Sequence, residues 1–156
     1  MKTILTLTTL AALTFSAHAD DDIRLEDCPQ PVQTTIKQNA RDGKIDEVDS
    51  HVIDGKALYI AEVDLPSDMD LKIHVSGDGK LVKTIEDIPL SELPEVVRKA
   101  AEGVAAGNGK LDDPDKETAD GQVTYHVEID RALQPDLKLV IAEDGSVLKQ
   151  TEDMDD

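Results

Sequence analysis

The sequence predicts an α+β fold made of two tandem repeats, each with one helix packed on an antiparallel sheet of three to four strands. Two observations predict this class. Tyr59 recurs as Tyr125 and Asp54-Gly55 recurs as Asp120-Gly121 at the same spacing, and such a fixed period is typical of repeated structural units. Within each period, a stretch with apolar residues at helical spacing precedes stretches in which apolar and polar residues alternate, as they do in half-buried strands.

Residues 1–19 are predicted to be a cleaved signal peptide. Lys2 supplies a positive charge, the stretch from Ile4 to Phe15 is uncharged, and Ala17-His18-Ala19 has the small residues that signal peptidase recognises. The uncharged stretch is shorter than the about 20 residues that a membrane-spanning helix needs. We therefore expect cleavage after Ala19, a periplasmic location, and no membrane insertion after cleavage.

The mature chain divides into repeat 1, residues 20–88, and repeat 2, residues 89–156, which ends in a short acidic tail. The offset between the repeats is shorter by one position up to and within the helices, as for Pro29 with Pro94 and Val32 with Val97, than downstream of them. Chance agreement in an Asp-rich chain is a poor explanation, because three pairs of turn dipeptides share the downstream register. These pairs are Asp42-Gly43 with Asn108-Gly109, Asp54-Gly55 with Asp120-Gly121, and Asp78-Gly79 with Asp144-Gly145.

One helix is expected near the start of each repeat. In repeat 1, residues 31–40 place Val32, Ile36 and Ala40 on one face. Pro94 suits the first turn of the second helix, because its missing N–H would have no helical partner there. The apolar stripe of this helix comprises Val97, Ala100, Ala101, Val104 and Ala105.

Alternation of apolar and polar residues predicts the strands. We expect them over residues 44–53, 59–65 and 71–75 in repeat 1, and over 124–130 and 137–141 in repeat 2. The segment from Leu111 to Ala119 contains Pro114, which cannot donate to a ladder, so we expect a poorly formed strand or an edge strand there. Whether the two repeats share one continuous sheet stays open at this point.

Composition excludes several classes of function. The chain has 34 acidic and 16 basic residues and a formal net charge of -18, which disfavours binding to nucleic acid and to anionic lipid. The single cysteine, Cys28, cannot form an internal disulfide. Cys28 is expected to be a half-buried small hydrophobic residue, and an intermolecular disulfide through it stays open.

The segments LPEVVRKAAEG, DGQVTYHVEID and LKLVIAEDGSVLK of repeat 2 resemble a PepSY-like domain, and residues 28–87 resemble a second copy. The resemblance implies small secreted or periplasmic domains with a fold similar to that of the beta-lactamase inhibitor protein. That inhibitor is a tandem of helix-plus-sheet units whose concave sheet grips an enzyme. Related domains occur in the propeptides of secreted peptidases, where inhibition is proposed. The resemblance brings no catalytic residues, so it implies a binding or inhibitory module and not an enzyme.

No catalytic set, cofactor site or metal site is predicted. His51, His74 and His126 lack a tight ligand spacing and are expected to be solvent-facing strand residues. An EF-hand loop beginning at Asp113 would need Gly at its sixth position and Glu at its twelfth, where Thr118 and Thr124 stand. Calcium-type cation binding by the acid-rich chain stays the alternative function.

The sheet face away from the helices is predicted to bind a periplasmic or secreted protein, such as a peptidase or another enzyme. Leu58 and Ile60 are the informative pair on this face. Their repeat counterparts, Thr124 and His126, are polar, so the fold does not require apolar residues there. The alternative is that Leu58 and Ile60 pack between the two repeats. The predicted face comprises Leu58, Ile60, Glu62, Asp64, Lys72, His74, Thr124, His126, Glu128, Asp130, Lys138 and Val140.

Overall fold

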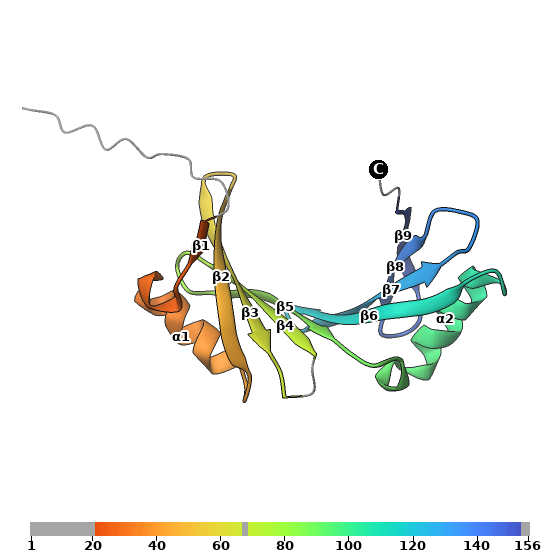
Figure 1. The fold of residues 1–156 in the computed structure, drawn as a ribbon, viewed down its shortest axis with the longest axis horizontal. Helices are drawn as coiled ribbons and strands as arrows, with labels where there is room; N and C mark the ends of the chain where they lie inside the picture. Colours follow the sequence, from red (N-terminus) through yellow and green to blue (C-terminus); the bar gives the residue numbers. More distant parts are fainter. Residues whose placement is uncertain (1–20, 67–68, 154–156) are drawn as a thin grey trace, which may run out of the picture.

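A computed structural model describes residues 21–66 and 69–153 (Figure 1). The predicted signal peptide, residues 1–19, lies outside the described residues. The elements follow in the order β1 (Asp21–Ile23), η1 (Leu25–Asp27), α1 (Gln30–Asn39), β2 (Lys44–Ile53), β3 (Lys56–Asp64), β4 (Asp70–Ser76), β5 (Leu81–Asp87), η2 (Leu90–Glu92), α2 (Glu95–Ala105), β6 (Lys110–Ala119), β7 (Gln122–Asp130), β8 (Leu137–Ala142) and β9 (Val147–Glu152).

All described strands belong to one sheet, and this corrects the expected fold class. The sheet has nine strands in the order β1 to β9, and every neighbouring pair is antiparallel. The expectation of two repeats, each with its own sheet of three to four strands, is therefore wrong. The fold is dominated by a single long meander, and α1 and α2 are its two α-helices within the described residues.

The joint between β5 and β6 makes the sheet continuous. Five residue pairs form it, from Lys83 opposite Ala119 to Asp87 opposite Asp115. The expectation that the segment carrying Pro114 would be poorly formed or an edge is also wrong, because β6 pairs on both sides. A bulge between Asp112 and Asp115 accommodates Pro114, since a bulged residue needs no ladder partner.

Two hydrophobic cores lie on the face of the sheet that carries the helices. Figure 1 shows α1 and α2 on the outer sides of the bent sheet, one at each end. The first core comprises Cys28, Val32, Ile36, Ala40, Val48, Ala61, Val63, Leu71, Ile73 and Val75. The second comprises Ile88, Leu93, Val97, Ala101, Tyr125, Val127, Ile129, Leu137, Leu139 and Ile141. The two tyrosines differ, because Tyr125 is 6% exposed whereas Tyr59 packs at the margin of the first core.

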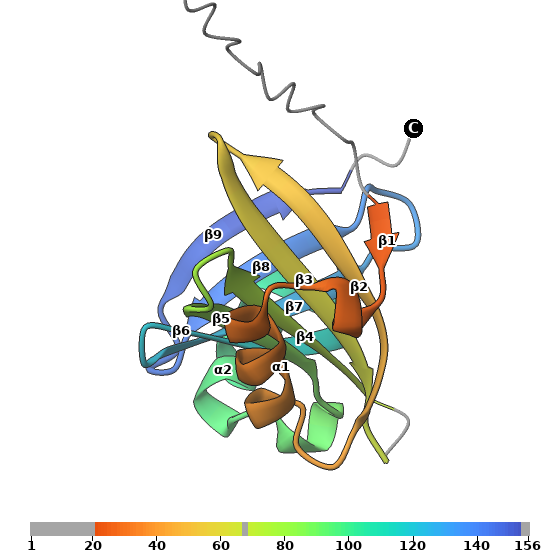
Figure 2. The same cartoon turned by 90° about the vertical axis from the view of Figure 1, so that its left-hand side faces the viewer.

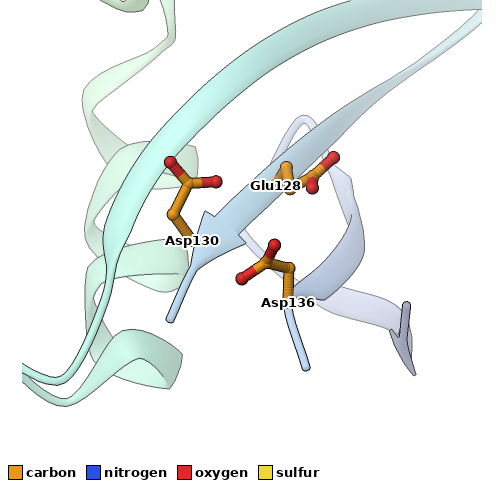
Figure 3. A group of neighbouring side chains, drawn as sticks. All are labelled: Glu128, Asp130 and Asp136. Atoms are coloured by element: carbon orange, nitrogen blue, oxygen red, sulfur yellow. The ribbon is translucent and has the colours of Figure 1, made fainter. Parts of the chain in front are cut away.

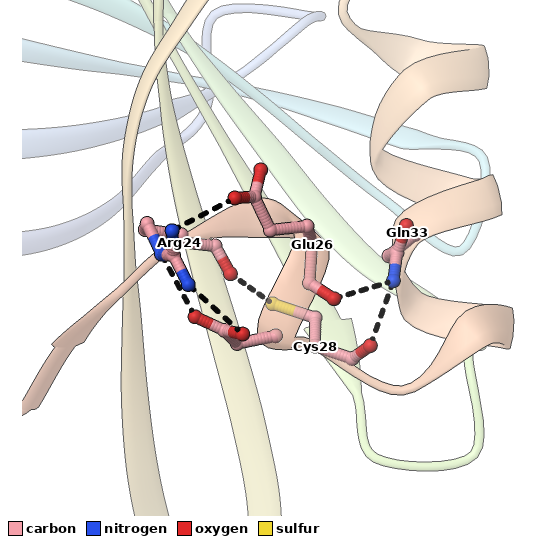
Figure 4. A network of polar contacts seen from close by, with 5 residues as sticks. Arg24, Glu26, Cys28 and Gln33 are labelled. Atoms are coloured by element: carbon pink, nitrogen blue, oxygen red, sulfur yellow. Dashed lines mark hydrogen bonds and ion pairs between the residues drawn. The ribbon is translucent and has the colours of Figure 1, made fainter.

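A short polar network fixes the entry into α1 (Figure 4). The side-chain amide of Gln33 donates to the backbone carbonyls of Glu26, at 3.2 Å, and Cys28, at 2.9 Å. The Cys28 thiol lies 3.7 Å from the carbonyl oxygen of Arg24 and is buried. Burial, followed by the charge of Asp27, raises the pKa of this thiol, so Cys28 is held as a neutral core residue.

Two hairpin turns lie in close contact with the first turns of the helices. Gly79, between β4 and β5, has φ +87°, and a Cβ there would lie 2.5 Å from Pro31 Cβ. Gly145, between β8 and β9, has φ +88°, and a Cβ there would lie 2.8 Å from Val96 Cγ2. Only glycine combines this backbone conformation with so close an approach. The helices of the described segments are all too short or too polar to cross a membrane.

Candidate protein-binding face

The sheet face opposite the helices is termed the open face. Residues that stand directly opposite each other on antiparallel strands share a face, so the register identifies its members. One row runs through Ile60, His74, Lys83 and Ala119. A second row runs through Glu62, Lys72, Ile85, Glu117, Thr124 and Ala142. A third runs through Asp87, Asp115, His126, Val140 and Lys149.

The open face is curved and belongs to both halves of the chain. In Figure 1 the sheet bends so that β2 and β3 rise at one end and β8 and β9 rise at the other, with β5 and β6 between them. Figure 2 shows the β2–β3 hairpin in front of the rest of the sheet, with its strands crossing the direction of β9. The rows cross the joint between β5 and β6, so a partner lying along the open face would contact both repeats.

Ion pairs occupy the middle of the open face. Lys72 Nζ lies 3.0 Å from Glu62 Oε1, and Lys83 Nζ lies 2.9 Å from Glu117 Oε2. The imidazole Nε2 of His126 lies 3.5 Å from the same oxygen of Glu117. The hydrogen bond with Glu62, despite the opposing effect of burial, raises the pKa of Lys72. These groups form a polar centre whose charges are largely paired.

His74 is the unusual group in this centre. Its Nε2 atom is buried and lacks a hydrogen-bond partner within the described residues. Burial, followed by the nearby charge of Lys83, lowers the pKa of His74 to about 4. Burial also lowers the pKa of His126, with Lys83 acting in the same direction and Glu117 opposing. The lowered pKa values favour the neutral form of both imidazoles, in which each ring offers one N–H donor and one nitrogen acceptor.

Leu58 and Ile60 lie half-buried on the open face of β3, opposite Ser76 and His74. Neither residue belongs to one of the two hydrophobic cores or to the partly buried residues packed against them. Ile60 stands opposite His74, and Leu58 lies two residues before Ile60 on the same face of β3. Both side chains therefore adjoin the polar centre. They form an aliphatic part of the open face.

The ends of the predicted face are acidic. Asp64 is exposed at the end of β3, with its Oδ2 3.5 Å from Lys44 Nζ. Asp130 is exposed at the end of β7 and lies beside Glu128 and Asp136, with one carboxylate oxygen of each within 4.8 Å of the others (Figure 3). Asp136 also accepts the backbone N–H of Arg131 at 2.6 Å. Burial and the neighbouring acids raise the pKa of Glu128, which Lys138 opposes.

A groove of about 570 Å³ follows β7 to β9 on the open face. Four residues of the predicted site, His126, Glu128, Lys138 and Val140, line it. Acids of β6 also contribute, and Lys149 and Thr151 come from β9. Lys138 forms an ion pair with Asp153. The groove therefore offers both acidic and basic groups, and Val140 is its half-buried aliphatic side chain on the open face.

Sequence reasoning missed the central strands of this face. Lys83, Ile85 and Asp87 of β5, and Asp115 and Glu117 of β6, come between the two parts that were predicted. The alternation along β5 could have indicated which of its residues share a face. Their place in the middle depended on the pairing of β5 with β6, for which no local pattern exists.

Comparisons with solved structures identify the fold. No protein-family model and no curated protein matches the chain. A DUF2874 family protein from Bacteroides uniformis shares 20% identity at a TM-score of 0.65, over 80% of this chain and 89% of that one. A presumed periplasmic protein from Bacteroides eggerthii shares 17% identity at a TM-score of 0.67, over 80% and 88%. A BLIP-like protein from Bacteroides fragilis shares 15% identity at a TM-score of 0.64, over 83% and 90%. The chain therefore has a BLIP-like fold.

Proposed function

We propose that the protein is a periplasmic, non-enzymatic binding or inhibitory module whose open face contacts another protein. The observation that carries the proposal is the continuous open face, on which Leu58 and Ile60 adjoin a polar centre built from both repeats. The BLIP-like fold and the descriptions of similar structures as periplasmic support it. The repeated motifs support a PepSY-like assignment with repeats over residues 20–88 and 89–156, and residues 1–19 match a cleaved signal peptide.

The chemistry of the open face favours a partner with a basic rim and an apolar centre. Leu58 and Ile60 offer aliphatic surface, and exposed aliphatic groups on a polar face are typical contact residues. Acids border the face at Asp64, Asp87 and Glu128. With a net charge of -18, the protein would attract a basic partner and speed its encounter at low salt. A secreted enzyme, such as a peptidase, is the class of partner we propose.

The test uses two matched double variants as bait. Leu58→Asp with Ile60→Asp places two charges on the open face. Leu133→Asp with Val52→Asp adds the same charge at positions that are 97% and 62% exposed, and Val52 stands opposite Ala57 on the face that carries the helices. Both baits should fold, as judged by circular dichroism and thermal unfolding. A periplasmic protein captured by the wild type and by the control pair, but lost with the open-face pair, supports the proposal once it binds again in purified form.

Two outcomes would contradict the proposal. If the open-face pair unfolds while the control pair does not, Leu58 and Ile60 are core residues. If a purified partner binds both double variants equally well, its contact surface lies elsewhere on the molecule.

Cation binding is the second candidate, favoured by the convergence of Glu128, Asp130 and Asp136. Carboxylate oxygens are the ligands that Ca²⁺ prefers. A calcium site would produce a saturable rise in melting temperature that sodium at equal ionic strength cannot reproduce. Asp130→Asn should abolish that rise, because it removes one carboxylate of the group. Asp136 is less suitable for this test, because it also accepts the backbone N–H of Arg131. Equal responses to the two salts would exclude this function.

A further inference from the structure

Two repeat-related pairs of aspartates face each other across neighbouring strands. Asp87 of β5 stands directly opposite Asp115 of β6, and Asp22 of β1 stands directly opposite Asp49 of β2. Asp87 is the repeat counterpart of Asp22 at the upstream offset, and Asp115 is the counterpart of Asp49 at the downstream offset. Like charges in directly opposed positions destabilise a sheet. The same unfavourable pairing occurs at equivalent positions of both repeats. This recurrence indicates that the pairing has the same physical role in each.

The second pair closes the joint that unites the two halves of the sheet. Asp87 and Asp115 are the last opposed pair of the β5–β6 ladder, next to the bulge that contains Pro114. Beyond them, the Ile88 N–H donates to the Pro114 carbonyl at 2.9 Å. Both aspartates are half-buried, and they line a cavity of about 530 Å³ together with Ile88 and Pro114. The last ladder pair of the joint therefore borders a space that water can enter.

The groups around Asp115 favour its protonated form. From β4, the Asp70 backbone N–H donates to Asp87 Oδ2 at 3.4 Å, and Lys72 is the nearby cation. Asp113 adds a negative charge from β6, and the neutral His126 stands opposite Asp115 on β7. Burial first, then the hydrogen bond and charge of Asp87 and the charge of Asp113, raise the pKa of Asp115 to about 7, whereas Lys72 lowers it.

The first pair is a more exposed version of the same arrangement. Burial, followed by the hydrogen bond and charge of Asp22, raises the pKa of Asp49. Glu62 on β3 acts in the same direction, and His51 opposes it. Asp22, Asp49 and Glu62 also raise the pKa of Glu47, a further acid of β2. Asp22 is exposed whereas Asp87 is half-buried, so solvent screens the first pair more effectively.

We propose that Asp87 and Asp115 share one proton across the β5–β6 joint, and that loss of this proton loosens the joint between the two halves of the sheet. Two adjacent carboxyl groups in a partly desolvated place cannot both ionise without strong repulsion, so they titrate as a coupled pair. Above neutral pH the two carboxylates repel each other. This repulsion weakens the last ladder pair and the adjacent Ile88–Pro114 hydrogen bond. This titration belongs to the free protein and does not depend on the proposed partner.

Proton linkage determines the direction of the pH effect. The folded protein retains a proton on Asp115 up to about pH 7, whereas an unfolded chain releases it near its ordinary pKa of about 3.9. Stability from this source is fully present below that ordinary value. It falls as the pH rises towards 7, because the folded state then binds more protons than the unfolded state. Above about pH 7 the loss is complete and constant.

The test compares Asp115→Asn with Glu102→Gln, which removes one negative charge from the exposed surface of α2. An amide at position 115 imitates the protonated carboxyl and can donate to Asp87. We expect Asp115→Asn to raise the melting temperature by about 3–6 °C at pH 8 and to give no gain at pH 4. Glu102→Gln should show no such dependence on pH. A carbon-13 titration of the wild-type aspartate carboxyls should show the Asp115 carboxyl losing its proton near pH 7.

Amide exchange at Ile88 reports on the joint itself. After correction for the intrinsic exchange rate, protection of Ile88 in the wild type should fall between pH 5 and pH 8. Asp115→Asn should remove that fall, whereas Asp22→Asn, which changes the surroundings of Asp49 and Glu47 but not those of Asp115, should preserve it. The proposal is overturned if the Asp115 carboxyl titrates near pH 4, or if Asp115→Asn leaves the pH dependence of Ile88 protection unchanged.

Discussion

β1 and β5 occupy equivalent places in the two halves of the molecule, but they cover their neighbours to different extents. β1 pairs with β2 over three residues, from Asp21 opposite Ser50 to Ile23 opposite Val48. β5 pairs with β6 over five residues. Beyond Ser50, Val52 and Ile53 of β2 are 62% and 56% exposed. Their repeat counterparts in β6, Thr118 and Ala119, are half-buried beside β5.

This difference explains how repeated sequences form one sheet. β5 ends repeat 1 and, at the same time, takes the place that β1 has in the first half. The backbone N–H and C=O groups of an interior strand need hydrogen-bond partners on both sides. β5 finds these partners in β4 and β6. The second half therefore borrows its first strand from repeat 1, whereas the first half has only the short β1.

The tyrosines should show the largest difference between the halves. Tyr125 is 6% exposed and stands opposite Lys116, whereas Tyr59 stands opposite the smaller Ser50 and is half-buried. Tyr125→Ala should lower the free energy of unfolding by about 3–5 kcal/mol, the cost of removing a large buried aromatic group. Tyr59→Ala should cost less, because part of its ring is already in water. Chemical denaturation of both variants measures the difference.

Tyr125→Phe is the control, because it keeps the ring and removes only the hydroxyl. A loss below about 0.5 kcal/mol for Tyr125→Ala is typical of surface substitutions and would contradict the placement of this ring in the second core.

The two turn glycines should differ less, and in the opposite direction. A Cβ at Gly79 would meet Pro31 Cβ at 2.5 Å and the Pro31 carbonyl carbon at 2.9 Å, and neither can move aside easily. At Gly145 the nearest atom is the side-chain Val96 Cγ2 at 2.8 Å, and the nearest backbone atom is the Val96 carbonyl oxygen at 3.1 Å, so the backbone approach is looser than at Gly79. We expect Gly79→Ala to destabilise the protein by about 1–3 kcal/mol through its backbone conformation, with the contact adding to this. Gly145→Ala should be milder, as thermal unfolding would show.

Gly121→Ala separates the two contributions in this series. Gly121 also has a positive φ, +77°, but a Cβ there would meet no atom within 4 Å. If all three alanine variants lose the same stability, backbone conformation alone accounts for the effect, and the close approach of the turns to the helices contributes nothing.

Local patterns in the sequence predicted the elements well but not their long-range pairing. The apolar stripe around Val32 and Ile36 is a property of one segment, and α1 covers Gln30–Asn39 where residues 31–40 were expected. The pairing of β5 with β6 joins segments whose match depends on both together. A proline is compatible both with a bulge and with an edge strand. Pro114 therefore could not show that its strand lies inside a continuous sheet.

The same limit applies to the candidate site. Alternation alone separated Leu58 and Ile60 from the core, because each strand shows which of its residues share a face. The opposition of Asp87 to Asp115 required the register of the joint. In the sequence, the one sign of this opposition is that Asp22 and Asp49 recur as Asp87 and Asp115 at the repeat offsets. That sign can be interpreted only when the neighbouring strands are known.

The smallest expected difference between the halves involves two arginine–glutamate contacts. Arg41 donates to both carboxylate oxygens of Glu86, at 2.5 and 2.9 Å. The repeat counterpart of Glu86 is Glu152, which Arg131 reaches with one nitrogen at 3.2 Å. Arg41 is 53% exposed, so Arg41→Gln should cost only about 1 kcal/mol at pH 7. Arg131→Gln also disturbs hydrogen bonds to Gln134 and Pro135, so Glu152→Gln is the cleaner comparison and should cost less.

The pH dependence of this contact distinguishes an ion pair from simple packing. The hydrogen bond from Arg41, despite the opposing effect of burial, holds the pKa of Glu86 below its ordinary value of 4.5. The resulting stability is present above pH 4.5 and is lost as the pH falls through the lower, folded-state pKa. Urea denaturation should therefore find Arg41→Gln destabilised at pH 7 and nearly equal to the wild type at pH 3. An equal cost at both pH values would mean that the aliphatic part of Arg41 stabilises the turn by packing, and that the bidentate geometry adds no charge-dependent stability to the first half of the sheet.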